Sequence, residues 1–457
     1  EKIKKNICHK IKVNKEIKKE IISKIPFDLT ESQLKVINEI ELDLKKEIPM
    51  LRLLQGDVGS GKTIVALITL ANVLKTKIQV ALMVPTEILA IQHYNYFCDL
   101  FKDIEIKTVL LTSKIKKNDK EKIYKQIENG TAQVIIGTHA IFQRNILFKK
   151  LGYIIIDEQH RFGVHQKFQL SAKGSNPHIL VMTATPIPRT LALTMYGNMN
   201  ISKINELPIN RKKIETITIP SNKISKIINS LKNIIKEKLN AFWICPLIED
   251  SEKLDLTAAT NRYEKLKKKF GNNVGIIHGK MDIEEKKKVI KKFKSKEILI
   301  LVSTTIIEVG IDVPDATVMI IEESNRFGLS QLHQLRGRVG RSDKKSKCVL
   351  VYKENNLNEF SKKRIETIKN NHDGFKIAEE DLKLRGFGEI LGTRQSGFQL
   401  FKIVDPLTDT KIMEDALKEA KIIFKNRKTM KKLDKDVINL FLRIYNQSSS
   451  TKYISIA

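Results

Sequence analysis

Residues 51–63 read Leu51-Arg52-Leu53-Leu54-Gln55-Gly56-Asp57-Val58-Gly59-Ser60-Gly61-Lys62-Thr63, a short apolar run followed by a glycine-rich turn. The last eight residues fit the phosphate-loop pattern G-x-x-x-x-G-K-T, which follows a buried strand and opens a helix. Glycines let the backbone wrap around phosphates, and the helix N-terminus adds its positive end. The nucleotide contacts that this pattern predicts are Gly56, Gly59, Ser60, Gly61, Lys62 and Thr63.

Two side chains of this loop have distinct expected roles. The ammonium group of Lys62 would neutralise the β- and γ-phosphates, and the hydroxyl of Thr63 would ligate Mg²⁺. A second element, Ile154-Ile155-Ile156-Asp157-Glu158-Gln159-His160, places Asp157 on the same metal shell, because it ends an apolar strand in Asp-Glu. Glu158 is suited to orient or deprotonate the attacking water. Together the two elements predict a site that hydrolyses ATP with Mg²⁺.

Short apolar runs alternate with stretches of helical spacing along most of the chain. The strands expected before residue 205 are Leu51–Gln55, Ile78–Val84, Thr108–Leu111, Val134–Gly137, Tyr153–Asp157 and Ile179–Thr183. Those expected later are Ala241–Cys245, Val274–His278, Ile298–Ser303, Thr317–Glu322 and Cys348–Tyr352. Apolar strands separated by helices are typical of a parallel sheet covered on both faces. We therefore predict an α/β fold with two similar parallel-sheet domains in tandem.

Shifts in composition divide the chain into six expected segments. These are a basic helical arm or linker at 1–24, a first domain at 25–205, a linker at 206–216, a second domain at 217–355, a charged helical and glycine-rich region at 356–425, and a tail at 426–457. No role is assigned to the tail. The chain does not begin with Met, which is compatible with a processed product or a fragment.

The 457 residues carry a net charge of +30, and 41% of them are hydrophobic. This composition is typical of a soluble globular protein, and the apolar runs are far shorter than the roughly 18 residues that cross a bilayer. The N-terminus has no apolar core of a secretory signal. Four scattered cysteines without a Cys-x-x-Cys pair exclude a zinc ribbon and indicate buried thiols in a reducing cytosol.

The positive charge favours a polyanionic partner such as nucleic acid. Lysine far outnumbers arginine, however, and an AT-rich genome would also raise the lysine content. Charge alone therefore leaves a solvated surface as the second interpretation.

The Asp157–His160 element resembles the DEQH variant of the DEAD/DEAH box of superfamily 2 helicases. Further motifs follow in that family's order, and they are Phe27–Gln33 (Q motif), Pro85–Gln92 (Ia), Gly137–Ala140 (Ib), Thr183–Pro186 (III), Ser303–Pro314 (V) and Gln331–Arg341 (VI). The resemblance implies two RecA-like motor domains of the P-loop NTPase class. It also implies that Arg338 and Arg341 reach the γ-phosphate from the second domain, so that hydrolysis acts as a domain-closure switch.

The same resemblance assigns the remaining site residues. In addition to the P-loop residues, ATP binding is implied for Phe27, Gln33, Gly310 and Asp312. Coupling of nucleotide state to the nucleic acid is implied for His160, Thr183, Thr185 and Gln334. Contacts to the DNA backbone are implied for Pro85, Thr86, Thr138, His139, Thr304 and Thr305.

Within superfamily 2, the details resemble the bacterial RecG branched-DNA helicases. Matching stretches are Arg161–Gln166, Pro186–Ala192, Trp243–Glu249 and His278–Met281. Asp373–Gly397 resembles the translocation motif that RecG shares with the transcription-repair coupling factor Mfd, a helical hairpin and loop that convert domain closure into duplex translocation. This makes 356–425 the translocation motif region, with Arg385, Arg394 and Gln395 as its DNA-binding or translocating residues.

The resemblance implies an ATP-dependent helicase or double-strand DNA translocase that remodels stalled forks and Holliday junctions in recombination and repair. The implied partners are branched or duplex DNA and single-strand-binding protein. A monomer in the bacterial cytoplasm, associated with the nucleoid and not with a membrane, is expected. RecG proteins carry an N-terminal wedge domain, whereas here only the basic segment 1–24 and two further residues precede Phe27.

Three other interpretations are less well supported by the sequence. An Mfd-like translocase acting on stalled transcription complexes would need a polymerase-binding module and a damage-protein-binding module, and neither is apparent. A non-catalytic DNA-binding remnant is disfavoured because Lys62, Asp157, Glu158, Arg338 and Arg341 are all intact. An RNA helicase of the DEAD class would lack the translocation motif.

Overall fold

The structure is a computed structural model of the whole chain. The residues that it describes are 8–74, 76–143, 145–158, 174, 176–185, 199–206, 213–246, 252–304, 313, 315–385, 409–426 and 432–444. The chain forms two compact units, one of residues 1–186 and 200–381, the other of residues 187–199 and 382–457. The first unit contains two sheets.

The first sheet has seven strands in the order β3-β4-β2-β5-β6-β1-β7. Its strands are β1 (Leu51–Gly56), β2 (Gln79–Met83), β3 (Thr108–Leu111), β4 (Val134–Gly137), β5 (Leu151–Ile156), β6 (His178–Thr183) and β7 (Asn200–Ile204). All of its strand pairs are parallel. Because parallel strands all end at the same edge, the loops after β1, β2, β4, β5 and β6 are brought together there.

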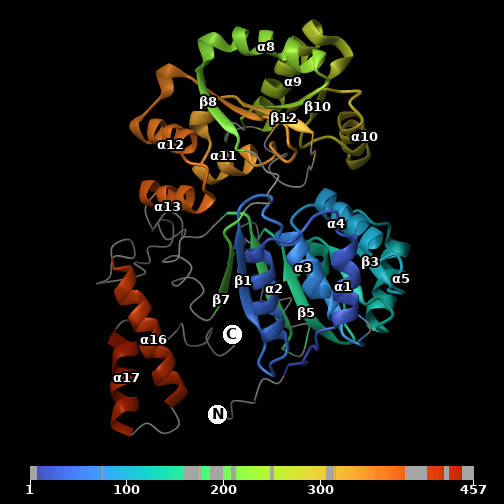
Figure 1. Cartoon of the computed structure of the whole chain (residues 1–457), viewed down its shortest axis with the longest axis vertical. Coiled ribbons are helices and arrows are strands. Elements are labelled where there is room, and N and C mark those ends of the chain that lie inside the picture. The colour runs from blue at the N-terminus through green and yellow to red at the C-terminus, as the bar shows by residue number, and fades with distance from the viewer. Residues whose placement is uncertain are drawn as a thin grey trace. The chain divides into compact units, whose positions relative to one another are not determined.

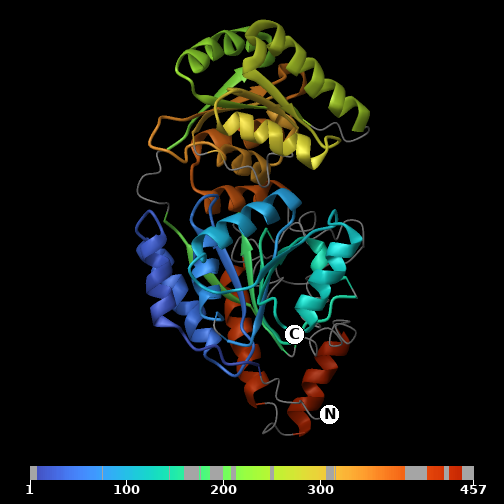
Figure 2. The ribbon, with the colours of Figure 1, turned by 90° about the vertical axis from the view of Figure 1, so that its right-hand side faces the viewer.

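Helices lie on both sides of this sheet in Figure 2, with α1 and α2 in dark blue on one side and α5 in cyan on the other. The helices are α1 (Lys15–Lys24), α2 (Glu31–Leu44), α3 (Lys62–Ala71), α4 (Glu87–Leu100) and α5 (Lys117–Glu128), with a 3-10 turn η1 (His139–Phe142) after β4. The helix α1 was expected as part of a basic arm or linker. Its Ile17 and Ile21 are buried in the same hydrophobic cluster as the strands, together with Ile11 before it. Of the lysines of α1, Lys15 and Lys19 are exposed, whereas Lys18 pairs with the buried Glu41 at 2.9 Å.

The second sheet has six strands in the order β10-β11-β9-β12-β13-β8. Its strands are β8 (Glu215–Pro220), β9 (Asn240–Ile244), β10 (Val274–Ile277), β11 (Ile300–Ser303), β12 (Ala316–Ile321) and β13 (Lys347–Tyr352). The pairs are again all parallel. The two parallel sheets confirm the predicted α/β fold with two motor-type domains.

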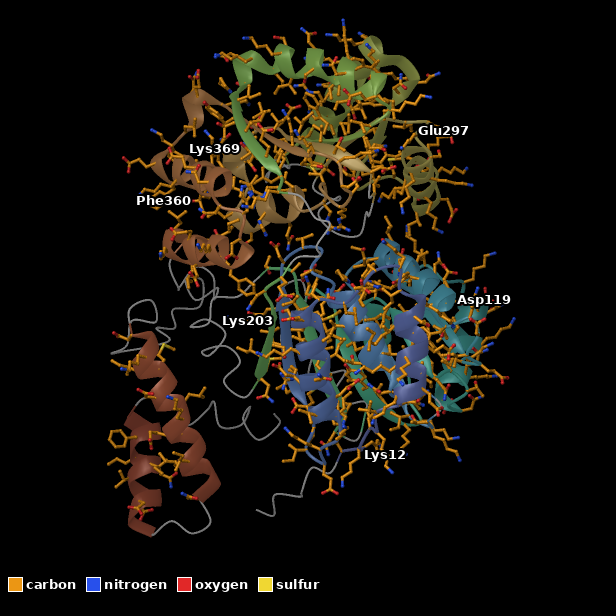
Figure 3. All side chains as sticks on the ribbon, in the orientation of Figure 1. Lys12, Asp119, Lys203, Glu297, Phe360 and Lys369 are labelled. Atoms are coloured by element: carbon orange, nitrogen blue, oxygen red, sulfur yellow. The ribbon has the colours of Figure 1, made fainter. Side chains whose placement is uncertain are left out.

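The helices of the second domain surround this sheet in Figure 1. They are α8 (Ile224–Lys236), α9 (Glu252–Phe270), α10 (Ile283–Lys294), α11 (Leu329–Arg336), α12 (Glu359–Asn370) and α13 (Gly374–Arg385). Short 3-10 turns are η3 (Ser221–Lys223), η4 (Gly271–Asn273), η6 (Ser324–Arg326) and η7 (Glu354–Asn356). Their outer faces carry charged side chains such as Lys369 on α12 (Figure 3). The core lies beneath them, around the fully buried Trp243.

Two strands were missed by the sequence reasoning. The edge strand β7 pairs with β1, and β8 pairs with β13 and begins at the end of the segment 206–216 that was expected to be a linker. Both are edge strands with alternating polar residues, and in β7 only Ser202 and Ile204 are buried. An edge strand gives a weak apolar signal because only part of it faces the core.

The second compact unit contains two amphipathic helices, α16 (Thr410–Asn426) and α17 (Lys432–Ile444), shown in red in Figure 1. Among the described residues of the chain, no helix is both long enough and apolar enough to cross a membrane.

Candidate nucleotide-binding and coupling site

The P-loop (Gly56–Thr63) connects the end of β1 to the start of α3, as the sequence predicts. Gly59 and Gly61 have φ angles of 78° and 88°, a left-handed conformation that side chains with a Cβ rarely adopt. Lys62 Nζ donates to the carbonyl oxygens of Gly56 at 2.9 Å and Asp57 at 2.8 Å. The ammonium group is thereby held over the turn, at the place where phosphates would bind. The residue as a whole is 8% exposed.

Gln33 braces this loop from α2. Its side chain closes a capping box with Thr30, and its Nε2 donates to the carbonyl oxygen of Ser60 at 2.8 Å. A Cβ at Gly61 would lie 2.3 Å from this Nε2, so the amide fits only against a glycine. Gln33 is buried and Phe27 is 46% exposed. The structure thus assigns Gln33 a contact to the loop itself, and the predicted contacts of Gln33 and Phe27 to adenine stay predictions.

Asp157 and Glu158 follow β5 at the same edge of the sheet. The carboxylate of Asp157 is buried, and its Oδ2 lies 3.5 Å from His93 Nε2 on α4. Glu158 has a φ of 52°, which is unusual for a residue with a side chain. Its Oε2 accepts a hydrogen bond of 3.3 Å from the backbone N–H of Ala184. The turn after β6 therefore holds the carboxylate that was predicted as the base.

Charged residues from both domains influence the pKa of Glu158. Burial raises the pKa of Glu158, and the neighbouring Asp157 carboxylate raises it further, whereas Lys62 and Arg338 lower it. Arg338 follows α11 in the second domain, so the structure brings one predicted arginine within the electrostatic reach of the predicted base. A carboxylate with a raised pKa is a stronger proton acceptor than an ordinary carboxylate.

The other predicted coupling residues are placed as follows. Thr183 Oγ1 bonds the carbonyl oxygen and the hydroxyl of Thr185, each at 3.0 Å, and so closes a local turn after β6. Gln334 is buried on α11, and its Oε1 has no hydrogen-bond partner among the residues that the structure describes. Arg341 Nε donates to the carbonyl oxygen of Gly337 at 3.4 Å, which curls the segment after α11 back on itself.

Five of the residues predicted to contact DNA lie at the carboxyl ends of strands. Pro85 and Thr86 follow β2, and Thr138 and His139 follow β4, which pairs with β2. The Thr86 side chain caps α4, whereas the buried Thr138 hydroxyl lacks a hydrogen-bond partner in the described part of the chain. Thr304 follows β11 in the second sheet and is also buried.

Six predicted residues lie outside the described residues, and these are His160, Thr305, Gly310, Asp312, Arg394 and Gln395. Arg385 is the last residue of α13, and its side chain is likewise outside the description.

Two side chains at the site, both histidines, were missed by sequence reasoning. His93 sits on the Asp157 carboxylate, and His333 Nε2 lies 2.6 Å from Asp57 Oδ1 of the P-loop. The partners of the first contact are separated by 64 positions in the chain, and those of the second by 276. The available signal was position alone, since His333 lies inside motif VI and His93 directly follows motif Ia on α4.

Comparisons with known proteins agree with this architecture. The family model described as DEAD/DEAH box helicase matches residues 30–194, and the helicase conserved C-terminal domain matches 222–343. The model described as ATP-dependent DNA helicase RecG, domain 3, C-terminal, matches residues 371–451. The three ranges together take in most of the chain and include the region that resembles the translocation motif.

Curated relatives are similar over nearly the whole of this chain. The ATP-dependent DNA helicase RecG of Aquifex aeolicus is 48% identical over 462 residues, which cover 100% of this chain and 58% of the relative. RecG of Borreliella burgdorferi is 44% identical over 96% of this chain and 64% of the relative. The chain thus spans somewhat less than two thirds of the length of these relatives.

A solved structure of RecG bound to a three-way DNA junction matches with a TM-score of 0.72 and 42% identity, over 90% of this chain and 54% of that chain. A DNA-bound structure of the helicase MrfA matches with a TM-score of 0.62 at 18% identity, which supports the fold alone. From the motifs, the two sheets and these similarities, we conclude that the chain belongs to the RecG family of ATP-dependent DNA helicases.

Proposed function

We propose that this chain is the motor part of an ATP-dependent DNA helicase, a double-strand DNA translocase that remodels stalled forks and Holliday junctions in recombination and repair. The observation that carries the proposal is the arrangement at one edge of the first sheet. Lys62 is held over the P-loop turn, Asp157 and Glu158 follow β5, and Arg338 of the second domain acts electrostatically on Glu158. An ATPase whose base and arginine lie on different domains can convert hydrolysis into relative motion of those domains.

The donor set fits ATP with Mg²⁺. The hydroxyl of Ser60 is buried in the P-loop without a hydrogen-bond partner among the described residues, so it is available to a phosphate oxygen. Thr63 offers a hydroxyl in the first turn of α3, and Asp157 offers a buried carboxylate at the end of β5. Hard oxygen ligands of this kind suit Mg²⁺. The metal would supply positive charge to the phosphates.

Each residue then has one task in hydrolysis. Lys62 would exchange the carbonyls of Gly56 and Asp57 for phosphate oxygens, and Thr63 and Asp157 would hold the metal. Glu158 orients the attacking water and takes its proton, for which its raised pKa is favourable. Arg338 and Arg341 stabilise the charge that develops on the transferred phosphoryl group.

DNA is the proposed polymer partner. The RecG structure that this chain resembles is bound to a three-way DNA junction, and the net charge of +30 suits a polyanion. Thr86, Thr138 and Thr304 lie at strand ends, where small polar groups can contact the phosphate backbone. Action as a monomer, contact with single-strand-binding protein and location at the bacterial nucleoid in the cytoplasm belong to the same proposal.

The test is steady-state ATPase activity with no DNA, single strands, linear duplex and a model fork. Stimulation by duplex and fork is expected, and Lys62→Ala should reduce it by about 100-fold or more, because the phosphates lose their cation. Lys77→Ala, which removes an exposed lysine of the same domain, is the matched control. Absence of stimulation by every DNA would contradict a DNA motor, and stimulation by RNA alone would favour an RNA helicase.

A further inference from the structure

His333 on α11 is held between the P-loop and an arginine of its own helix. The His333 side chain is buried, its Nε2 lies 2.6 Å from Asp57 Oδ1, and its Nδ1 lies 2.9 Å from Arg336 Nη2. A guanidinium group can only donate, so Nδ1 accepts and Nε2 carries the proton. His333 therefore donates to the Asp57 carboxylate, an interaction strengthened by the charge of the acceptor.

Arg336 fixes this histidine from behind. Its Nη1 donates to the carbonyl oxygens of Ile368 at 2.6 Å and Asn371 at 2.8 Å, at the end of α12. Arg336 is 3% exposed, so these bonds are shielded from water. The imidazole therefore has little freedom to turn away from Asp57. Because Arg336 ties it to α12, the imidazole moves together with the second domain.

Two glycines allow the backbones to approach at this contact. A Cβ on Gly337 would lie 2.7 Å from Val58 Cβ of the P-loop. A Cβ on Gly374, the first residue of α13, would lie 2.8 Å from His333 Nε2 and 3.2 Å from Asp57 Cγ. The hydrogen bond between Asp57 and His333 is thus enclosed by the end of α11 and the start of α13.

The contact lies next to the residues of the proposed hydrolysis. Gly337 directly precedes Arg338, whose charge acts on Glu158. On the other side, the backbone carbonyl of Asp57 accepts from Lys62 Nζ. A change in the Asp57–His333 bond would therefore move the arginine relative to the P-loop.

We propose that the hydrogen bond between His333 and Asp57 docks motif VI onto the P-loop and so sets the position of Arg338 during hydrolysis. His333 and Asp57 are positioning residues in this proposal, since they act through Arg338. The inference rests on the proposed ATPase function and deepens it, by naming the contact that brings the second domain's arginine to the first domain's site.

The first experiment compares His333→Ala with His333→Asn in DNA-stimulated ATPase activity. We expect His333→Ala to lower kcat about tenfold, the size of a typical coupling between residues in contact, with little change in the KM for ATP. The amide of His333→Asn retains an N–H donor for Asp57 and should restore part of the loss. His372→Ala, which removes an exposed histidine just before α13, is the matched control.

The second experiment separates positioning from a general loss of structure. In an Arg338→Ala background, His333→Ala should cause little further loss of kcat, because the residue through which it acts is absent. A variant that merely weakened the fold would multiply the two losses. A multiplicative loss, or a wild-type kcat in His333→Ala, would overturn the proposal.

A third measurement does not depend on hydrolysis. Asp57→Ala, His333→Ala and the double variant form a cycle in thermal unfolding, and a non-additive shift in Tm is expected if the two side chains interact. Additive shifts would overturn the docking contact even in an active enzyme. Conversely, the cycle could show non-additive Tm shifts while the wild-type chain has no ATPase activity with any DNA. That result would support the contact and contradict the proposed function.

Discussion

Gln33 Nε2 donates a hydrogen bond of 2.8 Å to the carbonyl oxygen of Ser60, and the two residues are 27 positions apart. The acceptor lies in the P-loop, while the donor is fixed by a capping box at the start of α2. The loop that would hold the phosphates is thus braced by a side chain from outside the G-x-x-x-x-G-K-T pattern.

Gln33→Glu should therefore weaken ATP binding. The substitution replaces the N–H donor by a carboxylate oxygen facing the Ser60 carbonyl, and leaving a buried polar group unpaired costs about 1–3 kcal/mol. At roughly tenfold per 1.4 kcal/mol, the KM for ATP should increase by about one order of magnitude. Glu31→Gln in the exposed first turn of the same helix is the control. An unchanged KM in Gln33→Glu would show that the loop holds its shape without this brace.

The ATPase rate should increase with pH through the raised pKa of Glu158. Burial and Asp157 raise this pKa above that of an ordinary carboxyl group, and only the ionised form can accept the proton of water. In Arg338→Gln, the acid limb of the residual activity should move to higher pH, because a cation that favours the ionised form is lost. Arg341→Gln serves as the comparison in the same pH series. Equal shifts in the two variants would contradict a specific effect of Arg338.

The first domain should lose stability in mildly acidic solution because of His178. Met50 N donates to His178 Nδ1 at 3.1 Å, and the opposite ring nitrogen lies 2.9 Å from the carbonyl oxygen of His9. Burial lowers the pKa of His178, so the folded state favours the neutral ring. The unfolded chain takes up a proton near pH 6.5, its ordinary value. The contribution of His178 to the free energy of unfolding should thus be fully present above about pH 6.5. It should be lost as the pH falls from there through the lowered pKa of the folded state.

Urea unfolding between pH 8 and pH 5 measures this dependence. His178→Asn should be less stable than the wild type at pH 8 and should show a flatter dependence on pH. His139→Asn, at an exposed position, should retain the wild-type dependence. If His178→Asn kept the full acid sensitivity, another group would have to carry it.

DNA binding should weaken steeply with salt. The net charge of +30 and the polar groups at strand ends favour contacts to phosphates, and each neutralised phosphate adds about −0.9 to the slope of log K against log salt for duplex DNA. Fluorescence anisotropy with a labelled duplex at several salt concentrations gives this slope. A flat response would contradict tracking along the phosphate backbone.

Gln395→Ala tests the translocation motif region, which the sequence resemblance assigns. This variant should retain DNA binding and much of the ATPase activity but lose movement along duplex, measured by displacement of a third strand. Normal displacement by Gln395→Ala would show that the assignment of the motif is wrong.

Much of the fold was accessible from the sequence because its strands are buried on both faces. Strands such as β5 (Leu151–Ile156) and β11 (Ile300–Ser303) are apolar at nearly every position, since a central parallel strand has no solvent side. The edge strands β7 and β8 were not predicted, because they are only partly buried and their polar residues interrupt the apolar run.

The chemistry proposed for the P-loop, for Asp157 and Glu158, and for the two arginines is predicted by local sequence. Spacing along a strand, turn or helix indicates which groups would face a phosphate. Contacts between elements were decided by tertiary structure alone. Three such contacts join segments that are distant in the chain. They are those of Gln33 with Ser60, of His93 with Asp157 and of His333 with Asp57. No spacing rule connects such residues, since their proximity depends on the order of the strands in each sheet and on how the helices pack over them.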